Sequence, residues 1–264
     1  MIHISDVHDT RIDAFRSLKD MRVDAWDTSC IAEGKKTVMA AISSGCPLTG
    51  LLAEQEYYDS FADVFVQAGI PHNQMFCAPR DVMTSLVGFS MHQGIIASVK
   101  APPLIDVIDV HLPCLVLNGI ADSENVGTIV RTAAAFGWKS LIVDERTSSP
   151  LLRRAVRVSM GTLFSMRIHR TEHLPSTLRE LRVLHDVDIV AAETHESAVD
   201  IAAKEFRVKT ALVVGAEGHG IADDVLRACS TIVRIPLHPS VPSLNVATAT
   251  ALSIYEYASQ HGVR

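Results

Sequence analysis

Short apolar runs alternate with amphipathic stretches along the second part of the chain. The strand-like runs are CLVLNGI, KSLIVD, FSMRIH, VDIVAAE, TALVVGA and TIVRIPL. Between them lie helix-like stretches such as NVGTIVRTAAAFG and PLLRRAVRVSM, a stretch reaching about His185, one from Ile221 to Cys229, and one from Ser243 to about Gln260. Strands separated by helical segments of about 10 to 15 residues indicate a parallel sheet covered on both faces. This part of the chain is therefore predicted to be an α/β domain.

Ligands of open parallel sheets bind beyond the carboxyl ends of the strands. The loops that follow Leu117, Val214 and Ile235 are therefore the places where chemistry is expected.

The first part of the chain has a different pattern. Charged, helix-like sequence fills about the first 25 residues, and a turn at Glu33-Gly34 leads into a helix that ends near Gly45. LTGLLAEQEY and NQMFCAPRDV predict short strands alternating with helices, and GIIASVK predicts a further strand. The prolines of APP at 101–103 interrupt the pattern. We predict two domains, residues 1–104 and 105–264.

Composition adds limits to this picture. The chain has 264 residues, of which 48% are hydrophobic, enough for two modest cores. No apolar run approaches the roughly 20 residues of a membrane-spanning helix, and the start does not resemble a secretory signal. The five cysteines are odd in number and never form CxxC, so neither a disulfide framework nor a zinc site is indicated, and we expect a cytoplasmic protein without a membrane partner.

The formal net charge of -6 argues against binding nucleic acid through bulk basicity. Local basic groups would have to do this, and the candidates are Lys35, Lys36, Arg153, Arg154 and Arg157. Arg153 and Arg157 share a face if the segment after Pro150 is helical. A solvated helix face is the alternative interpretation of the same arginines.

Three segments carry candidate chemistry. In NGIADSENVGTIVRTAAAFG, Asn125 lies just before a predicted helix that carries Arg131. The alternative interpretation is that Asn125 is only the N-cap of this helix and that Arg131 is only a surface residue. In LVVGAEGHGI, a buried strand ends in a glycine-rich turn containing Glu217, which could bring backbone N–H groups close to a ligand or be a plain hairpin. In VRIPLHPSVPSLNVATATALSIYEYA, Ser243 is a plain helix start, and capping does not explain Asn245.

Taken together and in this order, the three segments resemble the signature motifs of the SpoU/TrmH family of RNA 2'-O-ribose methyltransferases. The matching motifs are N-V-G-x-I-x-R-x-A-x-x-F-G, then G-A-E-G-x-G, then I-P-L followed by S-L-N-V-A-x-A. AEGKKTVMAAISSG and HQGIIASV are similar to the family's substrate-binding domain. The resemblance implies a catalytic domain with a deep trefoil knot of the SPOUT type. It also implies a small α/β, ribosomal-protein-like domain ahead of it.

The resemblance also implies a cofactor, S-adenosyl-L-methionine (SAM), and a homodimer formed through the knotted domain. By motif position, the cofactor contacts would be Gly215, Gly218, Ile235, Leu237 and Leu244. The catalytic group would be Arg131, Asn125, Glu217, Ser243 and Asn245.

An arginine stays charged in nearly all settings, so it is a poor general base. We therefore expect Arg131 to grip a substrate phosphate and stabilise the nascent alkoxide, while a phosphate oxygen or water takes the proton. Ser243 and Asn245 would hold the ribose, Glu217 would order its loop, and no metal is required.

Alternatives remain at this point. The chain could bind SAM and RNA without turnover, act as a base methyltransferase of the same superfamily, or be a nucleotide-dependent oxidoreductase, which the missing early glycine fingerprint disfavours. The sequence departs from the family pattern at Ser123, at His238-Pro239-Ser240 and at Pro242. An N-terminal domain of about 100 residues resembles that of the family's rRNA enzymes more than the short extensions of its tRNA enzymes, and this resemblance implies rRNA over tRNA as the substrate.

Overall fold

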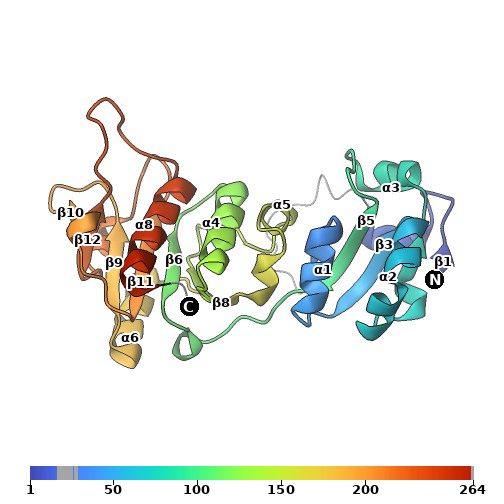
Figure 1. Cartoon of the computed structure of the whole chain (residues 1–264), viewed down its shortest axis with the longest axis horizontal. Coiled ribbons are helices and arrows are strands. Elements are labelled where there is room, and N and C mark those ends of the chain that lie inside the picture. The colour runs from blue at the N-terminus through green and yellow to red at the C-terminus, as the bar shows by residue number, and fades with distance from the viewer. Residues whose placement is uncertain (17–25, 27–28, 263–264) are drawn as a thin grey trace. The chain divides into compact units, whose positions relative to one another are not determined.

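The computed structural model describes residues 1–16, 26 and 29–262, which form two compact units (Figure 1). One unit comprises Met1–Ala101 and Ser149–Phe164, and the other comprises Pro102–Ser148 and Ser165–Arg264. The segment 149–164 thus packs with the first unit, although it follows the expected boundary in sequence.

The first unit contains a five-stranded mixed sheet. Its strands, in the order β1-β4-β3-β5-β2, are β1 (Ile2–His3), β4 (Met75–Cys77), β3 (Leu48–Ala53), β5 (Ile95–Lys100) and β2 (Ser29–Glu33). The helices are α1 (Lys35–Ser43), α2 (Gln55–Gln67), α3 (Arg80–Val87) and α5 (Arg153–Val158). The strands and helices expected from Glu33 to Lys100 are thus present. The helix-like first 25 residues include a 3-10 helix at Thr10–Phe15, and residues 17–25 lie outside the described part.

Close packing joins the segment 149–164 to the first unit. Gly161, at a φ of 81°, approaches α1 so closely that a Cβ there would lie 2.6 Å from the Cβ of Ala40. Arg153 forms an ion pair of 2.6 Å with Glu33, and its guanidinium lies 4.0 Å from the ring centroid of Phe89. These contacts hold α5 against the strand β2 and explain why the segment groups with the N-terminal residues.

The second unit is built on a parallel seven-stranded sheet. Its strands, in the order β10-β12-β9-β11-β6-β7-β8, are β10 (Val199–Asp200), β12 (Thr231–Arg234), β9 (Asp188–Ala192), β11 (Thr210–Gly215), β6 (Cys114–Asn118), β7 (Ser140–Val143) and β8 (Arg167–Arg170). All pairings between neighbouring strands of this sheet are parallel. The predicted parallel α/β fold is therefore confirmed, with the two-residue edge strand β10 as an unpredicted addition.

Helices cover the sheet of the second unit. They are α4 (Ser123–Ala135), α6 (Leu174–His185), α7 (Asp223–Leu226) and α8 (Val246–His261). The residues Val116, Ile189 and Val213 pack with the leucines of α6 in one buried cluster, while their chain neighbours, which are also buried, point to the other face because strand side chains alternate. The helices α4 and α8 pack against each other, and α8 also contacts β9 and β11 (Figure 1). Among the described residues, none of the helices combines the length and the apolar character that a membrane span requires.

Two predicted helix boundaries are wrong. The helix expected from Ile221 to Cys229 is only α7, Asp223–Leu226, with turns on either side. The last helix begins at Val246 instead of Ser243, because Asn245 has a non-helical backbone, with φ of -53° and ψ of 138°, and its side chain accepts hydrogen bonds from the N–H groups of Ala247 and Thr248. Asn245 is therefore the N-cap of α8, and the expectation that capping does not explain it is also wrong.

Candidate functional site

Three segments that are far apart in sequence meet through hydrogen bonds of Glu217. Its Oε1 accepts from Asn125 Nδ2 at 3.0 Å, from Asn245 Nδ2 at 2.7 Å and from the backbone N–H of Val246 at 3.4 Å. Asn245 Nδ2 also donates to Asn125 Oδ1 at 2.9 Å. The beginnings of α4 and α8 are thus joined to the glycine-rich turn after β11. We call Asn125, Glu217 and Asn245 the amide–carboxylate cluster.

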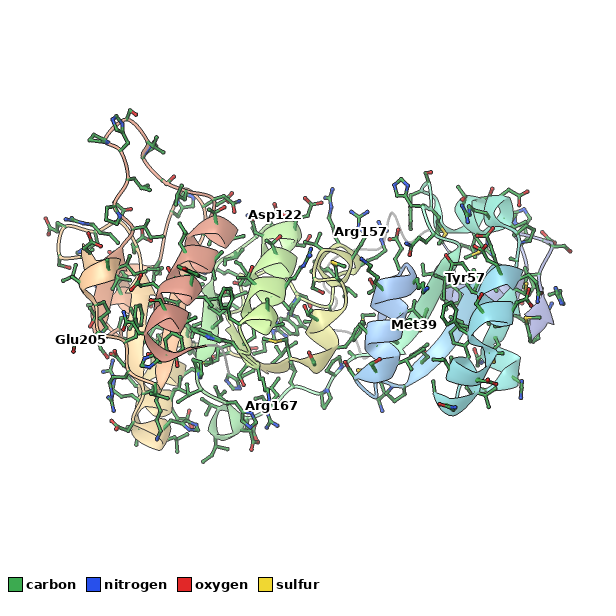
Figure 2. All side chains as sticks on the ribbon, viewed as in Figure 1. Met39, Tyr57, Asp122, Arg157, Arg167 and Glu205 are labelled. Carbon is green, nitrogen blue, oxygen red and sulfur yellow. The ribbon has the colours of Figure 1, made fainter. Side chains whose placement is uncertain are left out.

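Capping at the beginnings of α4 and α8 positions one side chain of each helix in this cluster. Asp122, labelled in Figure 2, is the N-cap of α4, and its carboxylate accepts from the N–H of Glu124. Asn125 therefore lies in the first turn of α4, where its side chain is buried, and the interpretation of Asn125 as the helix cap is wrong. Asn245, in turn, uses its Oδ1 to cap α8 and its Nδ2 to reach the other two members.

The glycine-rich turn after β11 folds back on itself. Ala216 and Gly220 exchange two backbone hydrogen bonds, of 3.2 and 2.9 Å, and Gly218 and Gly220 have φ values of 87° and 66°. A Cβ at Gly215 would lie 2.5 Å from the carbonyl carbon of Gly220 and from the nitrogen of Ile221, both backbone atoms. The turn therefore needs glycine where its two arms approach each other.

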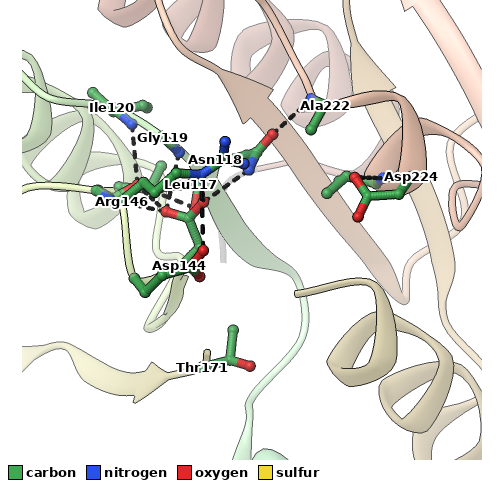
Figure 3. A network of polar contacts seen from close by, with 12 residues as sticks. Leu117, Asn118, Gly119, Ile120, Asp144, Arg146, Thr171, Ala222 and Asp224 are labelled. Atoms are coloured by element: carbon green, nitrogen blue, oxygen red, sulfur yellow. Dashed lines mark hydrogen bonds and ion pairs between the residues drawn. The ribbon is translucent and has the colours of Figure 1, made fainter. Parts of the chain in front are cut away.

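Buried polar groups support this turn and the loop after β6 (Figure 3). Asp144 is buried, and its carboxylate accepts from Asn118 Nδ2, from the N–H of Gly119, and from both the N–H and hydroxyl of Thr147. Asn118 Oδ1 then accepts from the N–H of Ala222 at 2.9 Å. This network connects the ends of β6 and β7 to the chain after the glycine-rich turn, and its members were not predicted from the sequence.

A cavity of about 750 Å³ opens beside the amide–carboxylate cluster. It is bordered by the carboxyl ends of β9, β11 and β12, by the loop that follows β12 and by the beginning of α8, which is where a ligand of a parallel sheet is expected. Its volume lies within the usual range for sites that bind small molecules or cofactors. The lining residues are Ala192, Glu193, Thr194, Ile201, Val214, Gly215, Ala216, Glu217, Gly218, Gly220, Val233, Ile235, Leu237, Pro242, Ser243, Leu244, Asn245, Val246 and Ala249.

The structure brings most of the predicted site residues to this cavity. All five candidate cofactor contacts line it, as do Glu217, Ser243 and Asn245. Asn125 does not line the cavity but is joined to it through the cluster. The Ser243 side chain is exposed and makes no hydrogen bond to the described residues.

Arg131 is the predicted site residue that lies apart. It follows Asn125 by six residues, which on an α-helix amounts to a rise of about 9 Å and a rotation of about 240°. Its side chain is exposed, does not line the cavity, and has no hydrogen bond or ion pair within the described residues. The expected convergence thus holds for Asn125, Glu217 and Asn245, while Arg131 lies on another part of the same helix.

The candidate RNA-contacting residues all belong to the first unit. Lys35 and Lys36 are exposed at the beginning of α1, and the Lys35 ammonium lies 4.5 Å from the ring centroid of Phe61. Arg154 and Arg157 are exposed on α5, where Figure 2 labels Arg157. Arg153 is committed to Glu33 and Phe89, as described above.

Glu193 lines the cavity but was not among the site residues predicted from the sequence. It directly follows the strand β9, and its carboxylate accepts from the backbone N–H groups of Thr194 and Ile221, each at 2.8 Å. The usable signal was a single acidic residue at the carboxyl end of a predicted parallel strand. The run VDIVAAE contained that signal, but no motif singled it out.

Comparisons with known proteins agree with this fold. The SpoU rRNA Methylase family matches residues 113–255, which is more than half of the chain. A protein of Mycobacterium tuberculosis strain H37Rv, named as an uncharacterized tRNA/rRNA methyltransferase, is 33% identical over 263 residues, covering 96% of this chain and 90% of that protein. The 23S rRNA (guanosine-2'-O-)-methyltransferase RlmB of Acinetobacter baylyi is 30% identical over 191 residues, covering 69% of this chain and 77% of that protein.

Solved structures share the architecture. An AdoMet-bound rRNA methyltransferase from Sinorhizobium meliloti superposes with a TM-score of 0.85 at 24% identity, covering 99% of this chain and 98% of that one. The SpoU methyltransferase AviRb from Streptomyces viridochromogenes, in complex with AdoMet, superposes with a TM-score of 0.82 at 23% identity, covering 96% and 98%. The fold and the site define an α/β methyltransferase domain with a cavity at the carboxyl edge of its sheet. The chain belongs to the SpoU rRNA methylase family.

Proposed function

We propose that this chain transfers a methyl group from SAM to the 2'-hydroxyl of a ribose in structured RNA, with rRNA favoured over tRNA. The observation that carries the proposal is the amide–carboxylate cluster, which joins the three motif segments beside a cavity lined by all five candidate cofactor contacts. The RlmB relatives, named as 23S rRNA 2'-O-methyltransferases, support the choice of ribose and of rRNA.

The cavity suits SAM in size and in the character of its walls. Ile235, Leu237 and Leu244 offer an apolar surface for an adenine ring. At Gly215 the backbone of the turn approaches so closely that there is no room for a side chain. Gly218 has nothing within 4 Å of the position that a Cβ would take. These residues would hold the cofactor, which supplies an electrophilic methyl group and so requires no metal.

The protein's own contribution to the reaction is positioning and charge. The amide–carboxylate cluster fixes the beginning of α8, and thereby holds the Ser243 hydroxyl at the cavity, where it can contact the target ribose. The side chain of Asn245 already donates two hydrogen bonds and accepts two within the protein, so we assign it a positioning role instead of ribose contact. Glu217 likewise orders the turn and α8.

Arg131 would bind a substrate phosphate and stabilise the negative charge that develops on the ribose oxygen. A guanidinium keeps its proton, so the hydroxyl proton passes to a phosphate oxygen or to water. Because Arg131 does not line the cavity of its own chain, we propose that it serves the cavity of a second copy in a homodimer. The trefoil knot and dimerisation through the knotted domain are parts of the same proposal.

The first unit would select the RNA. Lys35, Lys36, Arg154 and Arg157 are exposed cations of the first unit and would contact phosphates, which position RNA without reading its sequence. Arg153 would hold α5 in place through its ion pair with Glu33 and its contact with the ring of Phe89. A cytoplasmic location is also proposed, and it agrees with the five cysteines, which are all free thiols.

Mapping of 2'-O-methyl groups in total RNA from cells with and without the gene tests the proposal. We expect one ribose position, in rRNA, to lose its methyl group in cells that lack the gene, and to regain it on complementation with the wild type. An unchanged ribose map together with a lost base methylation would contradict ribose chemistry. Binding of SAM and RNA with no methylation change in cells or with purified RNA would instead support the inactive-member alternative.

A further inference from the structure

The cavity has an uneven distribution of charge. Among the described residues that line it, the ionisable side chains are two carboxylates, Glu193 and Glu217, and no lysine, arginine or histidine lines it. Neither carboxylate forms an ion pair with a cation in the described part of the chain. Their negative charge is therefore available to whatever occupies the cavity.

Glu193 is held in place by hydrogen bonds to β12 on one side and to the chain after the glycine-rich turn on the other. Its backbone N–H donates to the carbonyl of Val233 at 2.9 Å, which ties it to β12. Its Oε1 accepts from the N–H of Thr194, and its Oε2 accepts from the N–H of Ile221. A Cβ at Gly220 would lie 2.3 Å from Oε2, so the glycine-rich turn closes directly onto the carboxylate.

A fixed charge of this kind costs no reorganisation when a ligand arrives. Backbone N–H groups orient the two oxygens of Glu193, but they do not cancel its formal charge. Glu217 is fixed in the same way by Asn125, Asn245 and the N–H of Val246. The cavity therefore presents two preorganised negative charges. Glu193 is half-buried whereas Glu217 is exposed, so water screens the charge of Glu193 less than that of Glu217.

We propose that Glu193, acting together with Glu217, makes the cavity select a sulfonium cofactor over its neutral thioether product. This inference rests on the proposed function. Methyl transfer converts SAM to S-adenosylhomocysteine, because the sulfur keeps the electron pair of the broken S–CH3 bond and loses its positive charge. The amino and carboxylate groups are the same in both compounds, so the sulfonium is the difference that the carboxylates sense. Selection of this kind favours loading of the methyl donor and release of the spent product.

A purely structural role for Glu193 is the rival explanation, because its hydrogen bonds support the turn. The two roles differ in a measurable way. A damaged turn weakens binding of SAM and of S-adenosylhomocysteine alike, since both occupy the same walls. Loss of charge weakens binding of the cation and leaves the neutral product nearly unaffected. The ratio of the two dissociation constants therefore separates the roles.

The experiment is calorimetric titration of the full chain with three ligands: SAM, S-adenosylhomocysteine, and an analogue in which an amine-bearing carbon replaces the sulfonium. Glu193→Gln removes the charge and keeps one acceptor oxygen, whereas Glu193→Asp keeps the charge. Glu196→Gln is the matched control, because Glu196 is exposed three residues further on and does not line the cavity. We expect Glu193→Gln to weaken both cationic ligands by about three- to tenfold, the size of a partly screened charge interaction. Binding of S-adenosylhomocysteine should change by less than about twofold, which is below the loss expected for the cationic ligands.

The Glu193→Asp and Glu196→Gln variants should keep the wild-type ratio between SAM and S-adenosylhomocysteine. An equal loss for all three ligands in Glu193→Gln, or no loss for any, would overturn the proposal while leaving the methyltransferase assignment intact. If Glu193→Gln does not fold, the salt dependence of the wild-type ratio decides, since charge selection must weaken as salt screens it. A wild-type chain that binds none of the three ligands would overturn the proposed function itself.

Discussion

Asn125 and Asn245 are 120 residues apart in sequence, yet Asn245 Nδ2 donates a 2.9 Å hydrogen bond to Asn125 Oδ1 and both amides donate to the same oxygen of Glu217. Each asparagine lies at the beginning of a helix, and the two helices pack against each other. One acceptor atom therefore sets the spacing of α4 and α8 beside the cavity. A substitution of any residue of the amide–carboxylate cluster should therefore disturb the beginnings of both helices.

Asn245→Ala should cost both stability and activity. The substitution removes two capping hydrogen bonds to α8, a loss of about 1 kcal/mol in the free energy of unfolding, and also removes the donors to Asn125 and Glu217. Denaturant unfolding and steady-state methyl transfer measure the two effects, and we expect kcat to fall by about tenfold or more. Asp122→Ala is the control, because it removes the cap of α4 without touching the cluster. Equal activity losses in the two variants would contradict a special role for the cluster.

Gly215→Ala should close the cavity against its cofactor. The added methyl group would lie 2.5 Å from backbone atoms of Gly220 and Ile221, and no side-chain rotation can relieve that overlap. We expect the turn to shift and the affinity for SAM to fall by about tenfold or more, the size of a typical overpacking penalty. Calorimetry measures the affinity, and a thermal melt checks that the chain is folded. Wild-type affinity in the folded variant would show that the turn does not shape the cofactor site.

Arg131→Ala should impair the reaction and leave cofactor binding unchanged. The side chain is exposed and has no partner among the described residues, so its removal should not disturb the fold. We expect the single-turnover rate to fall by about 100-fold or more, the size found for other groups that stabilise developing charge. Lys139→Ala is a suitable control, because Lys139 is an exposed cation just beyond α4. A rate comparable to the wild type, measured with the methylated RNA, would refute the role given to Arg131.

Mixing two inactive variants tests whether Arg131 serves a second copy of the chain. Arg131→Ala has an intact cavity, whereas Glu217→Ala has an intact Arg131 and a damaged cavity. If the arginine acts across a dimer, each mixed dimer contains one complete site, and random exchange restores about a quarter of the wild-type activity. If the arginine acts within its own chain, mixing restores nothing. Size-exclusion chromatography coupled to light scattering must show a dimer for the first outcome.

Much of the catalytic fold could be predicted from the pattern of the sequence. Buried parallel strands such as Cys114–Asn118 and Thr210–Gly215 are continuous apolar runs, and the helices between them carry a clear helical period. The start of the last helix was harder to place, because Ser243 and Asn245 are both good capping residues and only the folded chain shows which one caps. The length of α7 was overestimated, because the apolar residues on either side of it pack into the core from turns and not from a helix.

The site could be predicted only where a motif marked it. Glu217 and Asn245 belong to recognisable segments, and both line the cavity. Glu193, Asn118 and Asp144 are single polar residues at strand ends, and their importance depends on which strands are neighbours in the sheet, which no local pattern contains. The position of Arg131 relative to the cavity depends on the rotation of α4 about its axis, which is set by packing against α8.

Ribose methylation can be tested by transfer of a labelled methyl group from SAM to purified rRNA, followed by complete digestion to nucleosides and separation. We predict that the label appears in a single 2'-O-methylated nucleoside, and that the wild-type chain produces it while Arg131→Ala does so far more slowly. Label on a base, or no transfer to any rRNA by a chain that binds SAM, would contradict this prediction.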